Sequence, residues 1–256
     1  MRLAYRLDGP IEAPVLVLSN SLGSTWRMWD GLLPALTERF RVLRYEHRGH
    51  LDSEVPAGPY RIEDIGRDLL GLLDELGLDR VSLAGLSLGG MTGMWLAAHH
   101  KSRVDRLALL CTSALLGPAT MWRDRAELVR AKGTEAIVEG GLRRWLTEEF
   151  IASDPIAVRL CREMMTSTPA EGYAGCCEAI ATMDLRPDLA AITAPTLVIA
   201  GADDPATPPS HAEVIAAGID GARLRVVPHA AHLATVEAPA AITELLLDHL
   251  LPEQDL

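Results

Sequence analysis

Six short, largely apolar runs recur along the chain, and helix-forming segments separate most of them. Continuous apolar runs of this length are typical of strands that are buried on both faces of a sheet. Strands that alternate with helices indicate a parallel, doubly wound sheet with helices on both faces. We therefore expect an α/β fold with strands at residues 15–18, 42–45, 81–84, 107–110, 197–200 and 224–227.

Two helical segments fit this alternation. Apolar residues from Ile62 to Leu76 have helical spacing, and Gly77 follows them at the position of a C-terminal cap. Residues 242–251 predict a final helix that covers the sheet, and Pro252 is expected to mark its end.

The pattern changes between residues 117 and 184. This stretch has no good strand pattern, and glycine and proline interrupt its helical segments at positions 133, 140, 141, 155 and 169. We interpret residues 117–184 as a helical cap inserted into a core that residues 1–116 and 185–256 form. Most apolar side chains of such a cap pack a core, but some must line the site beneath it.

The charge and the cysteines limit the partners that the chain can bind. A formal net charge of −11 disfavours nucleic acid and anionic membranes, which need clustered Lys and Arg, so we expect a small-molecule substrate. The first ten residues lack the apolar core of a signal peptide, which predicts a cytoplasmic protein. We expect no cofactor and no metal, and reduced, mostly buried thiols at Cys111, Cys161, Cys176 and Cys177.

The motif with the clearest chemical meaning is Gly-Leu-Ser-Leu-Gly at residues 85–89. It follows a predicted strand and precedes a helical run, which is the context that G-x-S-x-G requires. The glycines allow the helix and the strand to approach closely, while the sharp turn exposes the serine hydroxyl at the start of the helix. Ser87 is therefore the candidate nucleophile. Alone, the pentapeptide would also fit a serine in a glycine-rich turn.

A serine nucleophile needs a base, and the base needs an acid to hold its tautomer. In this strand–turn–helix context the chain order is Ser, then acid, then His. Asp203 and Asp204 follow the strand predicted at 197–200, and His229 and His232 follow the next one. Order and placement fit, but spacing alone leaves two acids and two bases open.

Resemblance to the α/β-hydrolases indicates which aspartate and which histidine of these pairs would act in catalysis. Asp204 precedes Pro208 by four residues, which is similar to the G-x-x-D-x-x-x-P acid loop of these enzymes. His232, with the run to Glu237 and Pro239, resembles their histidine loop. The resemblance implies an α/β-hydrolase fold in which Asp204 is the acid and His232 is the base.

Acyl transfer also needs N–H donors for the oxyanion. The backbone N–H of Leu88, directly after the nucleophile, is one candidate. The other should come from the loop after the strand at 15–18, where alignment with the common His-Gly-x segment of α/β-hydrolases nominates Leu22. Asn20 and Ser21 replace that His and Gly.

Along nearly its whole length the chain resembles the 3-oxoadipate enol-lactone hydrolases of the bacterial β-ketoadipate pathway. The resemblance is carried by residues 18–23 with 28–30, 84–90, 168–177 and 200–209. It implies that Ser87 attacks the carbonyl of a small anionic enol-lactone and that water hydrolyses the acyl-enzyme. Arg144, beside Trp145, resembles an Arg-Trp pair of the family and would hold the substrate carboxylate. Trp122 is a further candidate contact, although a solvated arginine and packed tryptophans would fit these positions too.

One region departs from the family pattern. Its usual Asp-x-Arg-Gly-His-Gly-x-Ser segment reads here as Glu-His-Arg-Gly-His-Leu-Asp-Ser, residues 46–53. Leu51 replaces a glycine, the residue best suited to positive φ, and Glu46 adds a methylene to a loop carboxylate. Two other functions fit the same fold: a promiscuous carboxylesterase or perhydrolase with the same triad, and a non-catalytic ligand receptor or scaffold. The second is disfavoured because a scaffold has no need of Ser, Asp and His in this order.

Overall fold

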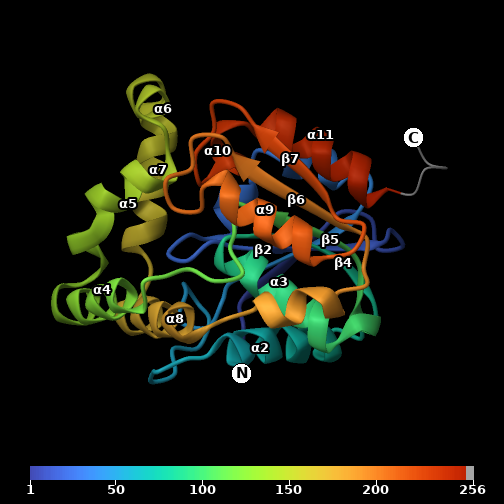
Figure 1. Ribbon diagram of the computed structural model, residues 1–256, viewed down its shortest axis with the longest axis horizontal. Helices are drawn as coiled ribbons and strands as arrows, with labels where there is room; N and C mark the ends of the chain where they lie inside the picture. Colours follow the sequence, from blue (N-terminus) through green and yellow to red (C-terminus); the bar gives the residue numbers. More distant parts are fainter. Residues whose placement is uncertain (252–256) are drawn as a thin grey trace.

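A seven-stranded sheet forms the centre of the computed structural model, which describes residues 1–251 (Figure 1). Strands β2 to β7 run parallel, and β1 pairs antiparallel with β3 at one edge. The spatial order is β1-β3-β2-β4-β5-β6-β7. The strands are β1 (Tyr5–Asp8), β2 (Val15–Ser19), β3 (Arg41–Tyr45), β4 (Val81–Leu86), β5 (Val104–Leu110), β6 (Thr196–Gly201) and β7 (Arg223–Val227). The predicted α/β fold is confirmed.

Burial explains both the success and the limits of the strand predictions. Every residue of β4 and β6 is buried, as their apolar runs predict. The expectation of burial on both faces was wrong for β7, because this strand lies at the sheet edge and most of its residues are exposed. Strand β1 was not predicted, because its residues alternate between polar and apolar and form no apolar run.

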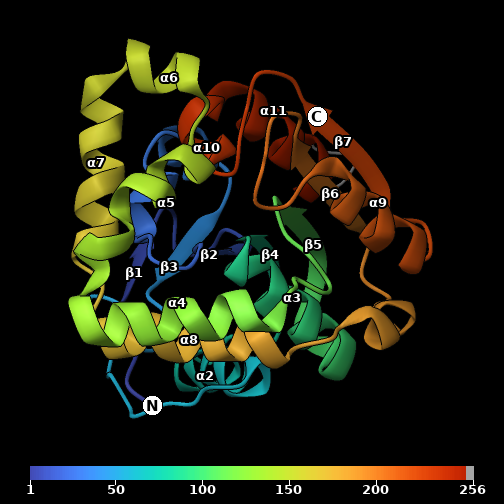
Figure 2. The same ribbon diagram turned by 60° about the vertical axis from the view of Figure 1, so that its left-hand side comes forward.

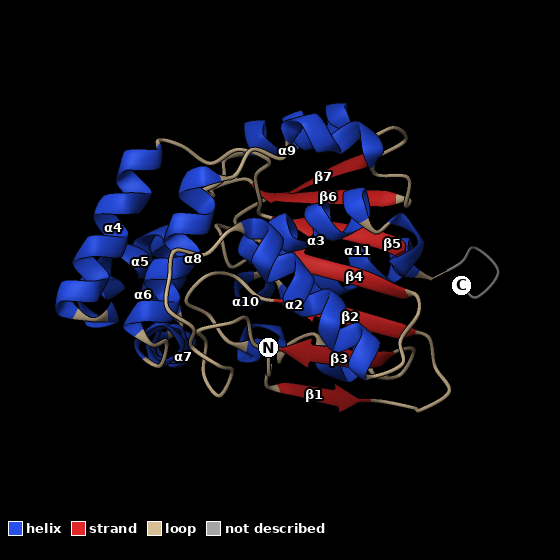
Figure 3. Ribbon diagram, turned by 90° about the horizontal axis from the view of Figure 1, so that it is seen from below, coloured by secondary structure: helices blue, strands red, loops and turns tan. Residues whose placement is uncertain are grey.

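Helices cover both faces of the sheet. On one face α2 (Ile62–Glu75) packs against α3 (Leu88–His99), and on the other α11 (Pro239–Leu250) contacts β5 (Figure 3). Short α1 (Leu33–Leu36) lies beside α11, and α9 (Pro209–Gly218) packs on β6 and β7. The predicted helices at 62–76 and 242–251 are thus present within a few residues. The predicted stop at Pro252 lies outside the described residues.

Five helices inserted between β5 and β6 form a separate layer beyond one end of the sheet (Figures 1 and 3). They are α4 (Ala119–Lys132), α5 (Val138–Trp145), α6 (Glu148–Ser153), α7 (Pro155–Thr166) and α8 (Ala170–Thr182). Figure 2 shows α4 and α8 side by side, with α5 above them. The arrowheads of β3 and β6 point toward this layer, so loops that follow the parallel strands meet the inserted helices (Figure 3).

The chain up to Leu251 contains no helix that is both long enough and apolar enough to cross a membrane. The four cysteines are buried and free.

Candidate active site

Ser87 occupies a strained turn between the last residue of β4 and the first of α3. Its φ of 57° and ψ of −114° lie in a region that side chains other than glycine rarely adopt. Gly89 makes the turn possible, because a Cβ there would lie 2.1 Å from the carbonyl oxygen of Ser19. The turn is held from below, where the Ser87 N–H donates to Leu110 O at 2.9 Å and the Thr112 hydroxyl donates to Ser87 O at 2.7 Å. A constrained serine therefore faces the layer of inserted helices.

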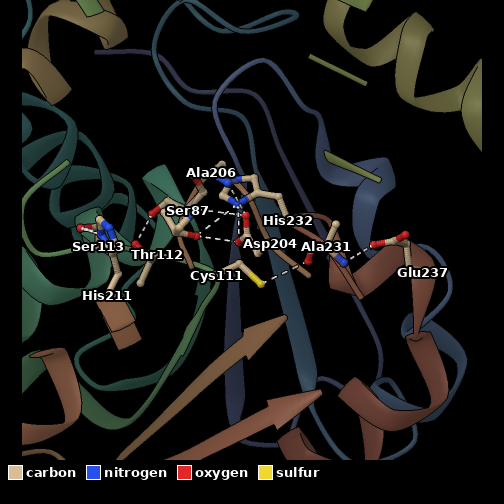
Figure 4. A network of polar contacts seen from close by, with 11 residues as sticks. Ser87, Cys111, Thr112, Ser113, Asp204, Ala206, His211, Ala231, His232 and Glu237 are labelled. Atoms are coloured by element: carbon tan, nitrogen blue, oxygen red, sulfur yellow. Dashed lines mark hydrogen bonds and ion pairs between the residues drawn. The ribbon is translucent and has the colours of Figure 1, made fainter. Parts of the chain in front are cut away.

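Asp204 and His232 are hydrogen bonded, with 2.9 Å between Asp204 Oδ2 and His232 Nδ1 (Figure 4). The other carboxylate oxygen accepts the N–H groups of Ala206 and Thr207 at 2.8 and 3.0 Å. Burial by itself raises the pKa of Asp204, but His232 and the hydrogen bonds from Thr207 hold that pKa below its ordinary value. An ionised Asp204 thus fixes His232 with Nδ1 protonated and Nε2 available as a base.

The structure separates these two residues from their sequence neighbours. Asp203 and His229 are exposed and line a different hollow on the surface. Ser87 and His232 line one common cavity, although no hydrogen bond joins their side chains among residues 1–251.

Leu22 and Leu88 are the predicted donors of backbone N–H groups to an oxyanion. Leu88 is the first residue of α3, so its N–H has no acceptor within the helix. In the loop after β2, the Gly23 N–H donates to His50 Nε2 at 3.0 Å, whereas the Leu22 N–H has no partner within the described chain. Leu22 lines the same cavity as Ser87. The two N–H groups without an acceptor among the described residues therefore remain the candidate donors to an oxygen that becomes negative when Ser87 attacks a carbonyl.

A buried network of polar side chains supports the loop that carries Leu22. Asn20 Nδ2 donates to Tyr45 O at 2.9 Å and to Glu46 Oε2 at 3.1 Å, while Trp29 Nε1 donates to Asn20 Oδ1 at 2.9 Å. The second oxygen of Glu46 accepts the Trp26 N–H at 2.8 Å. Burial raises the pKa of Glu46 to about 8, and the hydrogen bonds oppose this only in part. Asn20, which replaces the histidine of the common His-Gly-x segment, therefore contacts Glu46, which departs from the family pattern.

The segment after Glu46 also touches this loop. Leu51 has a φ of 41°, the positive value that a glycine adopts with less strain. His50 Nδ1 lies 3.1 Å from Arg48 O and donates to it, which leaves His50 Nε2 free to accept the Gly23 N–H. Burial lowers the pKa of His47 to about 3 and that of His50 to about 4, so both rings are neutral near pH 7. The sequence offered no signal for this supporting role.

The cavity above Ser87 has a volume of about 220 Å³ and lies between the sheet and the inserted helices. All three predicted substrate contacts, Trp122, Arg144 and Trp145, line it. Arg125 lines it as well, with its guanidinium carbon 4.6 Å from the centre of the Trp122 ring. Burial, followed by the charge of Arg125, lowers the pKa of Arg144. Neither arginine forms an ion pair with an acidic group in the described part of the chain, so the cavity favours an anion.

Sequence reasoning missed Arg125. The available signal was its spacing, because a residue three positions after Trp122 on one helix lies on the same face.

Comparisons with known proteins identify the family and the fold of the chain. Residues 14–132 and 165–239 match the family model described as the alpha/beta hydrolase fold. The curated 3-oxoadipate enol-lactonase 2 of Acinetobacter baylyi is 39% identical, over 93% of this chain and 89% of that protein.

Two solved structures have nearly the same backbone. The enol-lactonase from Burkholderia xenovorans LB400 superposes with a TM-score of 0.95 at 42% identity, and the match covers 97% of this chain and 96% of that one. A hydrolase from Pseudomonas aeruginosa PA01 gives 0.94 at 48% identity, over 97% and 94% of the two chains.

Proposed function

This chain belongs to the alpha/beta hydrolase family and within it to the 3-oxoadipate enol-lactonases, and from that premise we propose that it opens a small anionic enol-lactone through an acyl-enzyme. The observation that carries the proposal is the placement of Ser87, strained in its turn, in one cavity with a His232 that Asp204 orients. A purely structural serine would not require this placement.

The first half of the reaction forms the acyl-enzyme. His232 Nε2 accepts the proton of the Ser87 hydroxyl as its oxygen attacks the lactone carbonyl. The resulting oxyanion accepts hydrogen bonds from the backbone N–H groups of Leu22 and Leu88. When the ring C–O bond breaks, the leaving enol oxygen takes the proton from His232. The opened chain stays attached to Ser87 as an ester, and its enol converts to the ketone.

The second half regenerates the enzyme. His232 removes a proton from a water molecule, which attacks the ester carbonyl of the acyl-enzyme, and the same two N–H groups stabilise the second oxyanion. Return of the proton to the Ser87 oxygen releases a carboxylate product. Asp204 stays ionised throughout and stabilises the protonated ring.

The cavity supports a small anion as the substrate. Arg125 and Arg144 offer guanidinium groups to a carboxylate at its cap side, and a planar carboxylate suits such a donor fork. Trp122 and Trp145 supply apolar walls for the ring. We propose a substrate that combines one carboxylate with a flat lactone.

The test compares kcat/KM for 3-oxoadipate enol-lactone with that for p-nitrophenyl esters of increasing chain length. We expect the lactone to be preferred by about a hundredfold or more, because only the lactone uses the arginines. Equal kcat/KM values for the lactone and a short neutral ester would contradict the lactonase proposal and favour a general carboxylesterase. The cytoplasmic location stays a prediction.

A further inference from the structure

Two connections tie the cap to the loop that carries the catalytic histidine. The Leu233 N–H donates to Trp145 O, at the end of α5, at 2.8 Å. The second connection runs through Glu237, the last residue of the short helix α10 (Ala234–Glu237). Its side chain joins Ala231 in the histidine loop to Thr147 in the cap (Figure 4 shows the Ala231 side).

Glu237 makes this connection with both carboxylate oxygens. Oε1 accepts the backbone N–H of Thr147 at 2.8 Å and its hydroxyl at 2.9 Å, while Oε2 accepts the Ala231 N–H at 2.5 Å. Glu237 takes part in no ion pair within residues 1–251, so its partners are neutral donors. Only a group with two acceptor oxygens fits here, because an amide would turn its NH₂ toward one of these donors.

The two connections flank the catalytic base. His232 lies between Leu233, which bonds directly to the cap, and Ala231, which is connected to the cap through Glu237. The ring of His232 is held by Asp204. The same cap segment presents Arg144 and Trp145 to the cavity. A shift of the cap segment at Trp145 and Thr147 would therefore move the backbone on both sides of His232, because only a few covalent and hydrogen bonds separate them.

We propose that Glu237 is a positioning residue that couples the anion site of the cap to His232. When a carboxylate sits against Arg144, the end of α5 is held in one position, and Glu237 passes this constraint to the histidine loop. The base is then best placed for Ser87 only when an anionic substrate occupies the cap. This inference rests on the proposed function, and it adds that the substrate carboxylate contributes to kcat as well as to binding.

The first test is the isosteric variant Glu237→Gln. It should lower kcat for the enol-lactone about tenfold while KM changes less than about threefold, because the base is misplaced and the binding groups are intact. The matched control is Glu244→Gln, the same change at an exposed carboxylate of α11, which should behave as the native enzyme. A native kcat in Glu237→Gln would overturn the proposal.

A second pair of variants tests the cap side if Glu237→Gln does not fold. Thr147→Ser keeps the hydroxyl that donates to Glu237 and should retain the native kcat. Thr147→Val loses that donor and should lower kcat about threefold with little change in KM. Equal kcat values in these two variants would contradict the role of the Thr147 contact.

The decisive test is a double-mutant cycle. In the native background, Arg144→Gln should raise KM and lower kcat for the anionic lactone. In the Glu237→Gln background it should still raise KM, but leave kcat unchanged within about twofold. Equal losses of kcat in both backgrounds would overturn the coupling. An active Ser87→Ala would instead overturn the proposed function, so the two failures are distinguishable.

Discussion

The hydroxyl of Thr207 donates to Asp204 Oδ2 at 2.7 Å, which is the same oxygen that contacts His232. Thr207 therefore restrains the side chain of Asp204 in addition to the contact with His232. Removing this hydroxyl in Thr207→Val should lower kcat about tenfold, because Asp204 would orient His232 less firmly. Thr207→Ser keeps the hydroxyl and serves as the matched control. Steady-state kinetics measure kcat for both variants. Equal kcat values would contradict a role of the Thr207 hydroxyl in orienting Asp204.

The proposed triad predicts a characteristic pattern of losses. Ser87→Ala and His232→Ala should each lower kcat by about three orders of magnitude or more, and Asp204→Asn by somewhat less. The exposed His229 provides the control, since His229→Ala should be close to native. The kcat of each of the four variants is measured with the lactone as substrate. A large loss in His229→Ala would mean that the base was assigned to the wrong histidine.

Arg125, which lines the cavity, should act on substrate binding. Arg125→Gln should raise KM for the anionic lactone about tenfold and change KM for a neutral ester little, because only the anion uses the guanidinium group. Arg143→Gln is the control, since Arg143 is an exposed neighbour on α5. An equal effect of Arg125→Gln on charged and neutral substrates would show that this residue only shapes the cavity.

Glu46 should make stability depend on pH. Burial raises its pKa from an ordinary value of 4.5 to about 8, so between these values the folded state keeps a proton that the unfolded state has lost. Its contribution to the free energy of unfolding is complete below pH 4.5 and falls as pH rises toward 8. Below pH 6.5 the lowered pKa values of His47 and His50 act in the opposite direction, because the unfolded histidines bind protons first.

The informative window is therefore pH 6.5 to 8, where Glu46 acts without these histidines. The free energy of unfolding should decline there, with a slope of at most about 1.4 kcal/mol per pH unit from this one group. Denaturant titrations at several pH values measure it. Glu46→Gln, which cannot titrate, should show a flatter decline, and an unchanged slope would exclude Glu46 as the source.

Local features of the sequence were the most predictable. The strained turn at Ser87 could be predicted because its strand, turn and helix are contiguous, so the geometry follows from a few neighbouring residues. Choosing Asp204 over Asp203 and His232 over His229 required family resemblance, since adjacent positions in one loop differ only in where tertiary contacts place them. The structure buries one member of each pair and exposes the other.

Features that depend on distant contacts could not be predicted. The exposure of β7 depends on strand order, and the alternating pattern of β1 resembles that of any half-exposed segment. The roles of Glu46 and His50 appear only when the loop after β2 packs on the segment after β3. Glu237 resembled part of a family motif, but its bond to Thr147 joins residues 90 positions apart.

The pair of arginines has a consequence for the end of the reaction cycle. Hydrolysis of the proposed lactone would convert a substrate with one negative charge into a dianion, because the lactone carbonyl would leave as a second carboxylate. The same pair of positive charges would therefore hold the proposed product more strongly than the substrate. Product inhibition should follow, and because salt screens such attraction, added salt should speed the departure of product even as it weakens substrate capture.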